Sequence, residues 1–126
     1  MEVLSSRVIY GSPHFDSLRR FYEDVLGLHV YREYGPREEI LGVVFFLGGG
    51  FLEIKRASTA SPPVTLWLQV RDAGAEERRL RDAGVEVTKG VARMPWGLVE
   101  SCVQDPAGND LHLVEVPDDH PLRHRP

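Results

Sequence analysis

The chain has 126 residues with a formal net charge of −4, and its 42% hydrophobic and 27% charged residues suit a single globular domain. The negative charge and the absence of a basic stripe argue against a nucleic-acid partner, and no apolar run reaches the roughly 20 residues of a membrane span. Cys102 is the only cysteine, which excludes an intrachain disulfide and, without a secretory signal pattern at the N-terminus, predicts a cytoplasmic protein.

The first half of the chain reads as strand, helix and three strands. A β-branched and aromatic strand is expected at residues 7–12, and a helix at 16–26 with Ser12 as its cap. Gly27 is a typical helix stop. Further strands are predicted at residues 28–34, 40–47 and 51–56, with a glycine turn at 48–50.

The second half follows the same order after a linker at residues 57–63 that is rich in small residues and proline. A strand is expected at 64–70, and a helix at 75–83 with Asp72 as cap and Gly84 as stop. Three strands complete this half, at residues 85–90, 98–104 and 110–116.

This order makes the chain an internal repeat. Gly27 and Gly84 end the two helices 57 residues apart, and Glu53 and His112 lie in the last strands 59 residues apart. The sequence therefore predicts an α+β fold of two βαβββ modules, about 6–56 and 64–116, within one domain at 1–116. The modules are expected to form a half-open barrel with a ligand cleft, followed by a loosely ordered tail at 117–126.

Three segments resemble the vicinal oxygen chelate superfamily, which includes glyoxalases, bleomycin-resistance proteins and extradiol dioxygenases. Residues 21–28 (FYEDVLGL) are similar to its FYxxxLGF/L signature, and residues 105–109 (DPAGN) to its DPxGN turn. Residues 95–97 (PWG) resemble a segment common in the resistance proteins. The resemblance covers about residues 6–116 and implies the same two-module fold.

Enzymes of this superfamily usually hold a divalent metal ion at four strand positions. By the resemblance these positions fall on Arg7, Glu53, Thr65 and His112. A protonated arginine has no lone pair to offer a metal, and threonine is a poor neutral ligand. The sequence therefore predicts no metal cofactor, with Arg7 neutralising Glu53 in its place. A divalent ion, and Glu53 as a catalytic base, stay open as alternatives.

Aromatic side chains are candidates for ligand contact. If Leu66 faces the helix, alternation turns Trp67 and Gln69 to the concave side, where an indole ring offers a flat wall to a planar ligand. Trp96 is a candidate cover for the groove of a neighbouring subunit. Phe45 is taken as the inward member of the pair formed with Phe46.

These features predict a homodimeric protein of the bleomycin-resistance type, which binds a bulky aromatic or apolar compound. The predicted contacts come from seven residues: Arg7, Phe45, Glu53, Trp67, Gln69, Trp96 and His112. The acidic balance of the chain suggests that cationic compounds are favoured. The alternative is a metal-dependent lyase, isomerase or dioxygenase that acts on a small oxygenated substrate.

Overall fold

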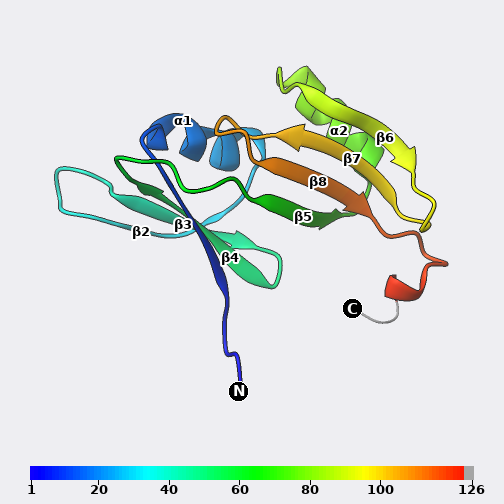
Figure 1. Cartoon of the computed structure of the whole chain (residues 1–126), viewed down its shortest axis with the longest axis horizontal. Coiled ribbons are helices and arrows are strands. Elements are labelled where there is room, and N and C mark those ends of the chain that lie inside the picture. The colour runs from blue at the N-terminus through cyan, green and yellow to red at the C-terminus, as the bar shows by residue number, and fades with distance from the viewer. Residues whose placement is uncertain (124–126) are drawn as a thin grey trace. The chain divides into compact units, whose positions relative to one another are not determined.

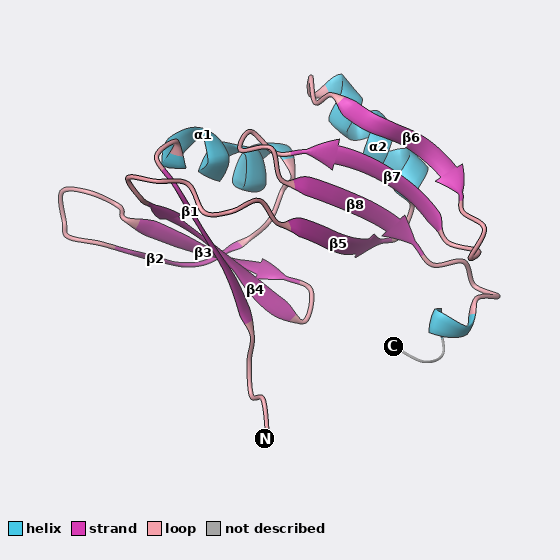
Figure 2. Cartoon of the chain, in the orientation of Figure 1, coloured by secondary structure: helices cyan, strands magenta, loops and turns pink. Residues whose placement is uncertain are grey.

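The computed structural model describes residues 1–123, so residues 124–126 of the predicted loose tail lie outside the described part. The chain divides into two compact units, residues 1–62 and 63–126. Each unit contains one mixed four-stranded sheet and one main helix lying on one face of that sheet (Figures 1 and 2). The predicted α+β class and the pair of similar modules are confirmed, and neither sheet closes on itself.

The first unit follows the predicted order. Its elements are β1 (Arg7–Ser12), α1 (Phe15–Arg20) continued by a π-helical turn (Phe21–Val25), β2 (Val30–Tyr34), β3 (Gly42–Leu47) and β4 (Gly50–Arg56). The strands are ordered β1-β4-β3-β2, and we call them sheet 1. β1 pairs with β4 in parallel, whereas the other pairs are antiparallel.

The second unit repeats this layout. Its elements are β5 (Thr65–Val70), α2 (Ala73–Asp82), β6 (Val87–Arg93), β7 (Val99–Gln104), β8 (Asp110–Glu115) and a short 3-10 turn (Pro121–Arg123). The order β5-β8-β7-β6, which we call sheet 2, matches sheet 1 strand for strand. The parallel β5–β8 pair aligns Thr65 with Asp110, as the β1–β4 pair aligns Arg7 with Phe51.

Capping residues and glycines determine where each helix begins and ends. Asp72 caps α2, since its side chain accepts a hydrogen bond from the Ala75 amide. Ser12 is not the cap of α1, contrary to the prediction: it belongs to β1, and its hydroxyl accepts from the His14 amide before the helix begins at Phe15. Gly27 and Gly84 follow the two helices with φ of 83° and 86°, a conformation that glycine adopts without strain.

The face of each sheet that carries its helix forms the core of its unit. In the first unit this core is built from buried side chains of the helix and of three strands: Tyr10, Phe15, Leu18, Tyr22, Val43, Phe45, Leu52 and Ile54. In the second unit it includes Leu66, Leu80, Val103, Leu111 and Leu113. We call the opposite side the open face of each sheet. Side chains alternate between the two faces, so the open faces carry the remaining positions.

The segment after β8 folds back within its own unit. The His120 ring bonds through Nε2 to the Trp96 carbonyl at 3.0 Å, and its Nδ1 accepts from the Leu122 amide. Gly97, with φ of 91°, lies directly against the His120 ring. Among residues 1–123, no helix has the length and apolar character needed to cross a membrane.

Candidate functional site

A carboxylate on the open face of sheet 1 is held from two sides. Glu53, on β4, is 7% exposed. Its Oε1 accepts a hydrogen bond from Arg7 Nη1 at 2.8 Å, and its Oε2 accepts from the Tyr34 hydroxyl at 2.6 Å. Both carboxylate oxygens are therefore engaged by donors, one of them positively charged.

Strand register brings these three side chains together. Arg7 pairs with Phe51 across the parallel β1–β4 ladder, so its long side chain reaches Glu53 two residues further along the same face. Tyr34 lies two strands away and pairs with Gly42 on β3. A Cβ atom at Gly42 would lie only 2.2 Å from Tyr34 Cζ, so the missing side chain is what lets the tyrosine ring cross β3 toward Glu53.

The protonation states follow from these contacts. Burial would by itself raise the pKa of Glu53, but the hydrogen bonds from Tyr34 and Arg7 and the charge of Arg7 outweigh it and hold the pKa below its usual value. Burial, with the hydrogen bond to Glu53, raises the pKa of Tyr34 to about 12. At neutral pH Glu53 is thus an ionised, fully engaged and weakly basic carboxylate, while Tyr34 remains a donor.

An aromatic cluster lies beside this carboxylate. Tyr31, Phe46 and Phe51 contact one another with ring centroids 5.0–5.6 Å apart. The Tyr31 and Phe46 side chains are 51% and 45% exposed, which is unusual for rings of this size. The Arg7 guanidinium carbon lies 6.0 Å from the Phe51 ring centroid and joins the cluster to the carboxylate.

Phe45 has to be corrected as a ligand contact. It is fully buried on the helix-bearing face, where its ring lies 6.3 Å from that of Tyr22. Alternation along β3 places its neighbour Phe46 on the open face instead. Alternation in the sequence places one of the two rings on the open face, but it does not say which. The pairing of β3 with β4 decides between them.

The open face of sheet 2 carries the other predicted residues. Trp67 pairs with His112 across the β5–β8 ladder, and Thr65 and Gln69 lie on the same face. The Trp67 side chain is 51% exposed. Of the sequence-predicted residues, Arg7 and Glu53 thus meet on sheet 1, and the members of the second unit gather on sheet 2.

Glu100 organises the polar part of sheet 2. This buried residue accepts a hydrogen bond from Trp96 Nε1 at 2.6 Å, and its Oε1 lies 3.8 Å from His112 Nδ1. The Trp96 ring is therefore fixed to its own unit through Glu100, although it is 56% exposed. Nearby, burial raises the pKa of the Cys102 thiol, which keeps it in the unreactive protonated form.

The residues present do not fit a divalent metal ion. In the first unit Arg7 occupies one expected ligand position, and its guanidinium is bonded to the carboxylate in the other. In the second unit Thr65 stands two strand positions from His112. Across residues 1–123, no group of three or more His, Cys, Asp or Glu side chains could hold a metal.

Sequence reasoning missed Tyr34 and Glu100, and it did not name Phe51 as a ligand contact. Alternation along β2 could have placed Tyr34 with Arg32, but the register shift between Val30 and Arg32 hides this pattern. Glu100 lay close to the predicted Trp96, yet only the pairing of β7 with β8 shows that it reaches His112 as well.

Comparison with solved structures shows the fold. TioX from Micromonospora sp. ML1 is 19% identical, with a TM-score of 0.77 over 88% of this chain and 97% of that chain. Lactoylglutathione lyase from Agrobacterium tumefaciens is 20% identical, with a TM-score of 0.71 over 91% and 94% of the two chains. A superfamily member from Sphaerobacter thermophilus DSM 20745 is 22% identical, with a TM-score of 0.72 over 91% and 98%.

No curated protein matches the chain at a significant level. The family model described as the glyoxalase/bleomycin resistance protein/dioxygenase superfamily matches residues 6–113, which is most of the sequence. It covers the first βαβββ module and the second as far as residue 113 in β8, and it includes Arg7, Glu53, Thr65 and His112. The chain therefore belongs to the glyoxalase/bleomycin resistance protein/dioxygenase superfamily.

Proposed function

We propose that this protein is a dimeric small-molecule-binding protein of the cytoplasm, which takes up a bulky aromatic or apolar compound without a metal ion. The observation that carries the proposal is on the open face of sheet 1. There, a fully engaged carboxylate lies next to exposed aromatic rings. Such a surface offers contact area to a ligand and little chemistry.

The state of Glu53 speaks against catalysis by this residue. A general base needs a pKa near the working pH. Both oxygens of Glu53 already accept hydrogen bonds, and the lowered pKa makes proton abstraction unfavourable. Arg7 supplies the positive charge that a metal ion would bring, so the buried carboxylate is stabilised without one.

Exposed aromatic side chains support ligand binding on both sheets. Three large rings are each about half exposed, namely Phe46 and Tyr31 on sheet 1 and Trp67 on sheet 2. All three lie in strands, and Tyr31 lies at the register shift of β2. Large rings on the open face of a sheet cost solubility unless something covers them. Family members of this length commonly dimerise, and a dimer would form two equivalent binding sites.

Calorimetric titration with bleomycin and with a series of two- and three-ring aromatic compounds tests the proposal. At least one compound should bind saturably and be recovered unchanged. Trp67→Ala should weaken that binding by about 1–3 kcal/mol if the ring stacks on the ligand, whereas Trp67→Phe retains most of the affinity. Affinity that is indifferent to Trp67, Phe46 and Trp96 alike would refute the aromatic site.

Two further measurements test the other parts of the proposal, the absence of a metal ion and the dimer. Elemental analysis of protein purified without chelator should find no divalent ion at a stoichiometric level, and near-stoichiometric zinc, nickel, manganese or iron would contradict the proposal. Sedimentation velocity should show a dimer, and a stable monomer would remove the dimeric arrangement while leaving ligand binding to be judged by calorimetry.

A further inference from the structure

The charge of one sheet face differs in sign from the charge of the chain. The whole protein carries −4, which would favour cationic ligands. On the open face of sheet 1, strand register places three basic side chains: Arg7 on β1, Arg32 on β2 and Lys55 on β4. Glu53 is the acidic residue that shares the face with them, and the charges of Arg7 and Lys55 both act on it.

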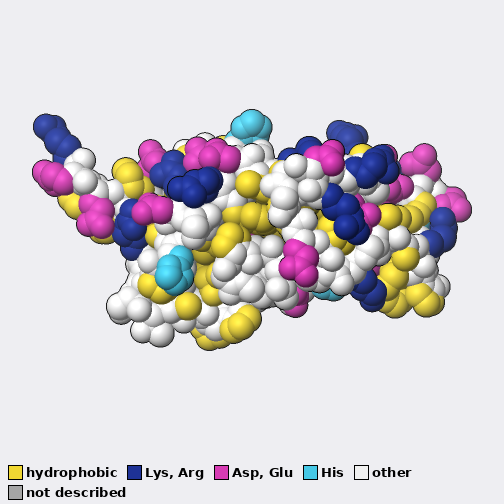
Figure 3. Space-filling view, turned by 90° about the horizontal axis from the view of Figure 1, so that it is seen from above, with side chains coloured by type: hydrophobic (Ala, Val, Ile, Leu, Met, Phe, Trp, Pro, Cys, Tyr) yellow, Lys and Arg dark blue, Asp and Glu magenta, His cyan; other side chains and the backbone are white. Residues whose placement is uncertain are grey.

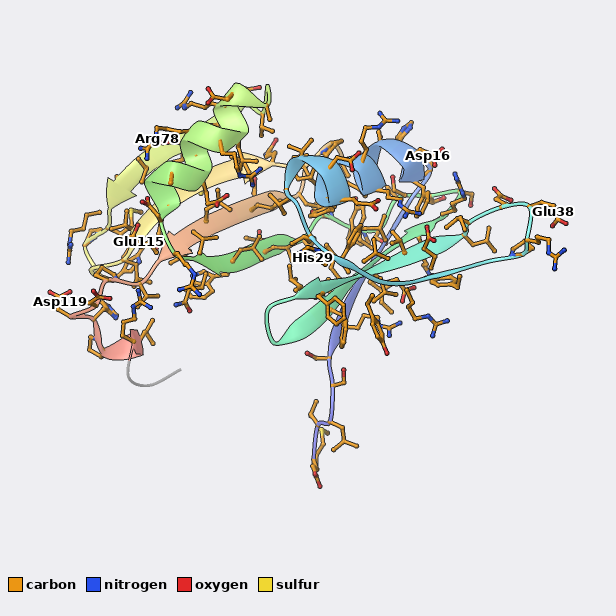
Figure 4. The ribbon with its side chains drawn as sticks, turned by 180° about the vertical axis from the view of Figure 1, so that it is seen from behind. Asp16, His29, Glu38, Arg78, Glu115 and Asp119 are labelled. Atoms are coloured by element: carbon orange, nitrogen blue, oxygen red, sulfur yellow. The ribbon has the colours of Figure 1, made fainter. Side chains whose placement is uncertain are left out.

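Four other acidic side chains of this unit lie away from the open face. Glu33 alternates to the helix-bearing side and pairs with Arg19 of α1. Asp16 of α1 and Glu39 of the β2–β3 loop both pair with Arg56. Glu38 lies at the tip of the same loop, away from the sheet (Figure 4). On the face drawn in Figure 3, basic and acidic side chains are interleaved. Among the strand residues that register places on this face, three cations therefore outnumber one carboxylate.

Arg7 also keeps unused donors. Within residues 1–123, one of its five N–H groups donates a hydrogen bond, from Nη1 to Glu53 Oε1, and the side chain is 37% exposed. Arg32 forms no ion pair within residues 1–123, and its guanidinium carbon lies 6.0 Å from the Tyr34 ring centroid. Two guanidinium groups with hydrogen-bond donors to spare thus come from the two edge strands of sheet 1, and Arg7 is the one that contacts the aromatic cluster.

A hollow of about 270 Å³ adjoins this surface. It is lined by Arg7 and Phe51 together with Ser6, Val8, Leu47 and Gly50. Its volume lies below the roughly 300–1,000 Å³ of common small-molecule sites, so it can extend a binding surface on the open face but does not enclose a ligand by itself. The hollow thus places the Phe51 ring and the Arg7 guanidinium next to each other.

We propose that the open face of sheet 1 binds an aromatic carboxylate, with its rings on Tyr31, Phe46 and Phe51 and its carboxylate on Arg7, while Arg32 adds positive charge from the opposite edge strand. The proposal rests on the function proposed above and specifies its ligand as an organic anion. Guanidinium groups suit this role because their fork of N–H donors matches the two oxygens of a carboxylate. Glu53 stays bound to Arg7 and Tyr34 and orients the guanidinium.

A matched set of probes tests the ligand class by isothermal titration calorimetry: 2-naphthoate, its neutral amide 2-naphthamide, and the cation 2-naphthylmethylammonium. The naphthoate should bind about tenfold more tightly than the amide, as expected for a charge-assisted hydrogen bond, and the cation should bind most weakly. Raising the salt concentration should reduce this preference, because the cations lie on an exposed face.

Variants locate the site. Arg32→Gln should weaken naphthoate binding about three- to fivefold and leave the amide unchanged, and Phe46→Ala should weaken both. Arg20→Gln is the matched control, because it removes the same charge from an exposed position on α1. Neither Arg32 nor Arg20 forms an ion pair in the described part of the chain, so both variants should fold, which circular dichroism checks.

Each contrary outcome has a separate meaning. If the amide or the cation binds as tightly as naphthoate, the anion preference is refuted while aromatic binding stands. If naphthoate binds but responds to Trp67→Ala and not to Arg32→Gln or Phe46→Ala, the site lies on sheet 2 and this proposal fails. If none of the three probes and no larger aromatic compound binds, the proposed function fails as well.

Discussion

The absence of a side chain at Gly42 lets the Tyr34 ring reach Glu53 on sheet 1, and replacing this glycine tests that geometry. The Cβ of Gly42→Ala would lie 2.2–2.5 Å from Cζ, the hydroxyl oxygen and Cε2 of Tyr34, far inside van der Waals contact. The tyrosine ring must therefore leave its position over β3 and give up its hydrogen bond to Glu53. Tyr34 lies on the edge strand β2, so the ring has room to turn toward solvent.

The cost follows from what is lost. A hydrogen bond to a charged acceptor contributes about 1.5–3 kcal/mol, and Tyr34 is only partly buried, so we expect Gly42→Ala to destabilise the protein by about 1–3 kcal/mol. In a Tyr34→Ala background the obstructing ring is gone, and the same substitution should be neutral or slightly stabilising, since alanine restricts the unfolded chain. The coupling free energy between the two positions should therefore exceed about 1 kcal/mol.

Urea unfolding followed by circular dichroism measures all four proteins of this double-mutant cycle. Gly49→Ala is the matched control: its Cβ would meet no atom within 4 Å, and its φ is not in the left-handed region. It should change the free energy of unfolding by less than about 0.5 kcal/mol. If Gly42→Ala costs the same in the wild type and in Tyr34→Ala, the ring does not lie over Gly42 and the argument for the engaged carboxylate fails.

Two other predictions concern stability. The pKa of Glu53 is lower in the folded chain than its usual 4.5, so the carboxylate adds stability above that pH and loses it as the pH falls through the folded value. Wild-type stability measured by urea unfolding should therefore fall more steeply below about pH 4.5 than that of Glu53→Gln, and parallel pH profiles would contradict this. Asn109→Ala should cost about 2–4 kcal/mol, because the buried amide donates to Asp105 and its Oδ1 accepts from the Val64 amide. The control Gln104→Ala removes an exposed hydrogen bond and should cost less than about 0.5 kcal/mol; equal losses in the two variants would refute a special role for the turn.

Short-range patterns determined the order of elements. Asp72, Gly27 and Gly84 act through their own backbone neighbourhoods, so the sequence alone placed these helix ends within a few residues. The strands likewise follow from local alternation and turn residues. The repeat then predicted two similar modules, because equal spacings imply equal supersecondary units.

Of the two hydrogen-bonded contacts of Glu53, only one could be predicted from the sequence. Its pairing with Arg7 follows from the sequence, because the family's strand positions coincide with a carboxylate and a residue that cannot bind a metal. Tyr34 does not follow, because it reaches Glu53 across β3 from a strand that contains a register shift. Such a contact depends on which strands are neighbours in the sheet, and the local sequence pattern does not contain that information.

The choice between Phe45 and Phe46, and the sign of charge on the open face of sheet 1, were decided by tertiary structure alone. Alternation along one strand gives two sets of side chains, but only pairing with β4 and packing of the helix say which set is buried. Net charge is likewise a sum over all surfaces, whereas a ligand meets one face. The sequence determined the residues and their periodicity; the sheet determined which of them share a face, because strands far apart in the chain lie side by side only in the fold.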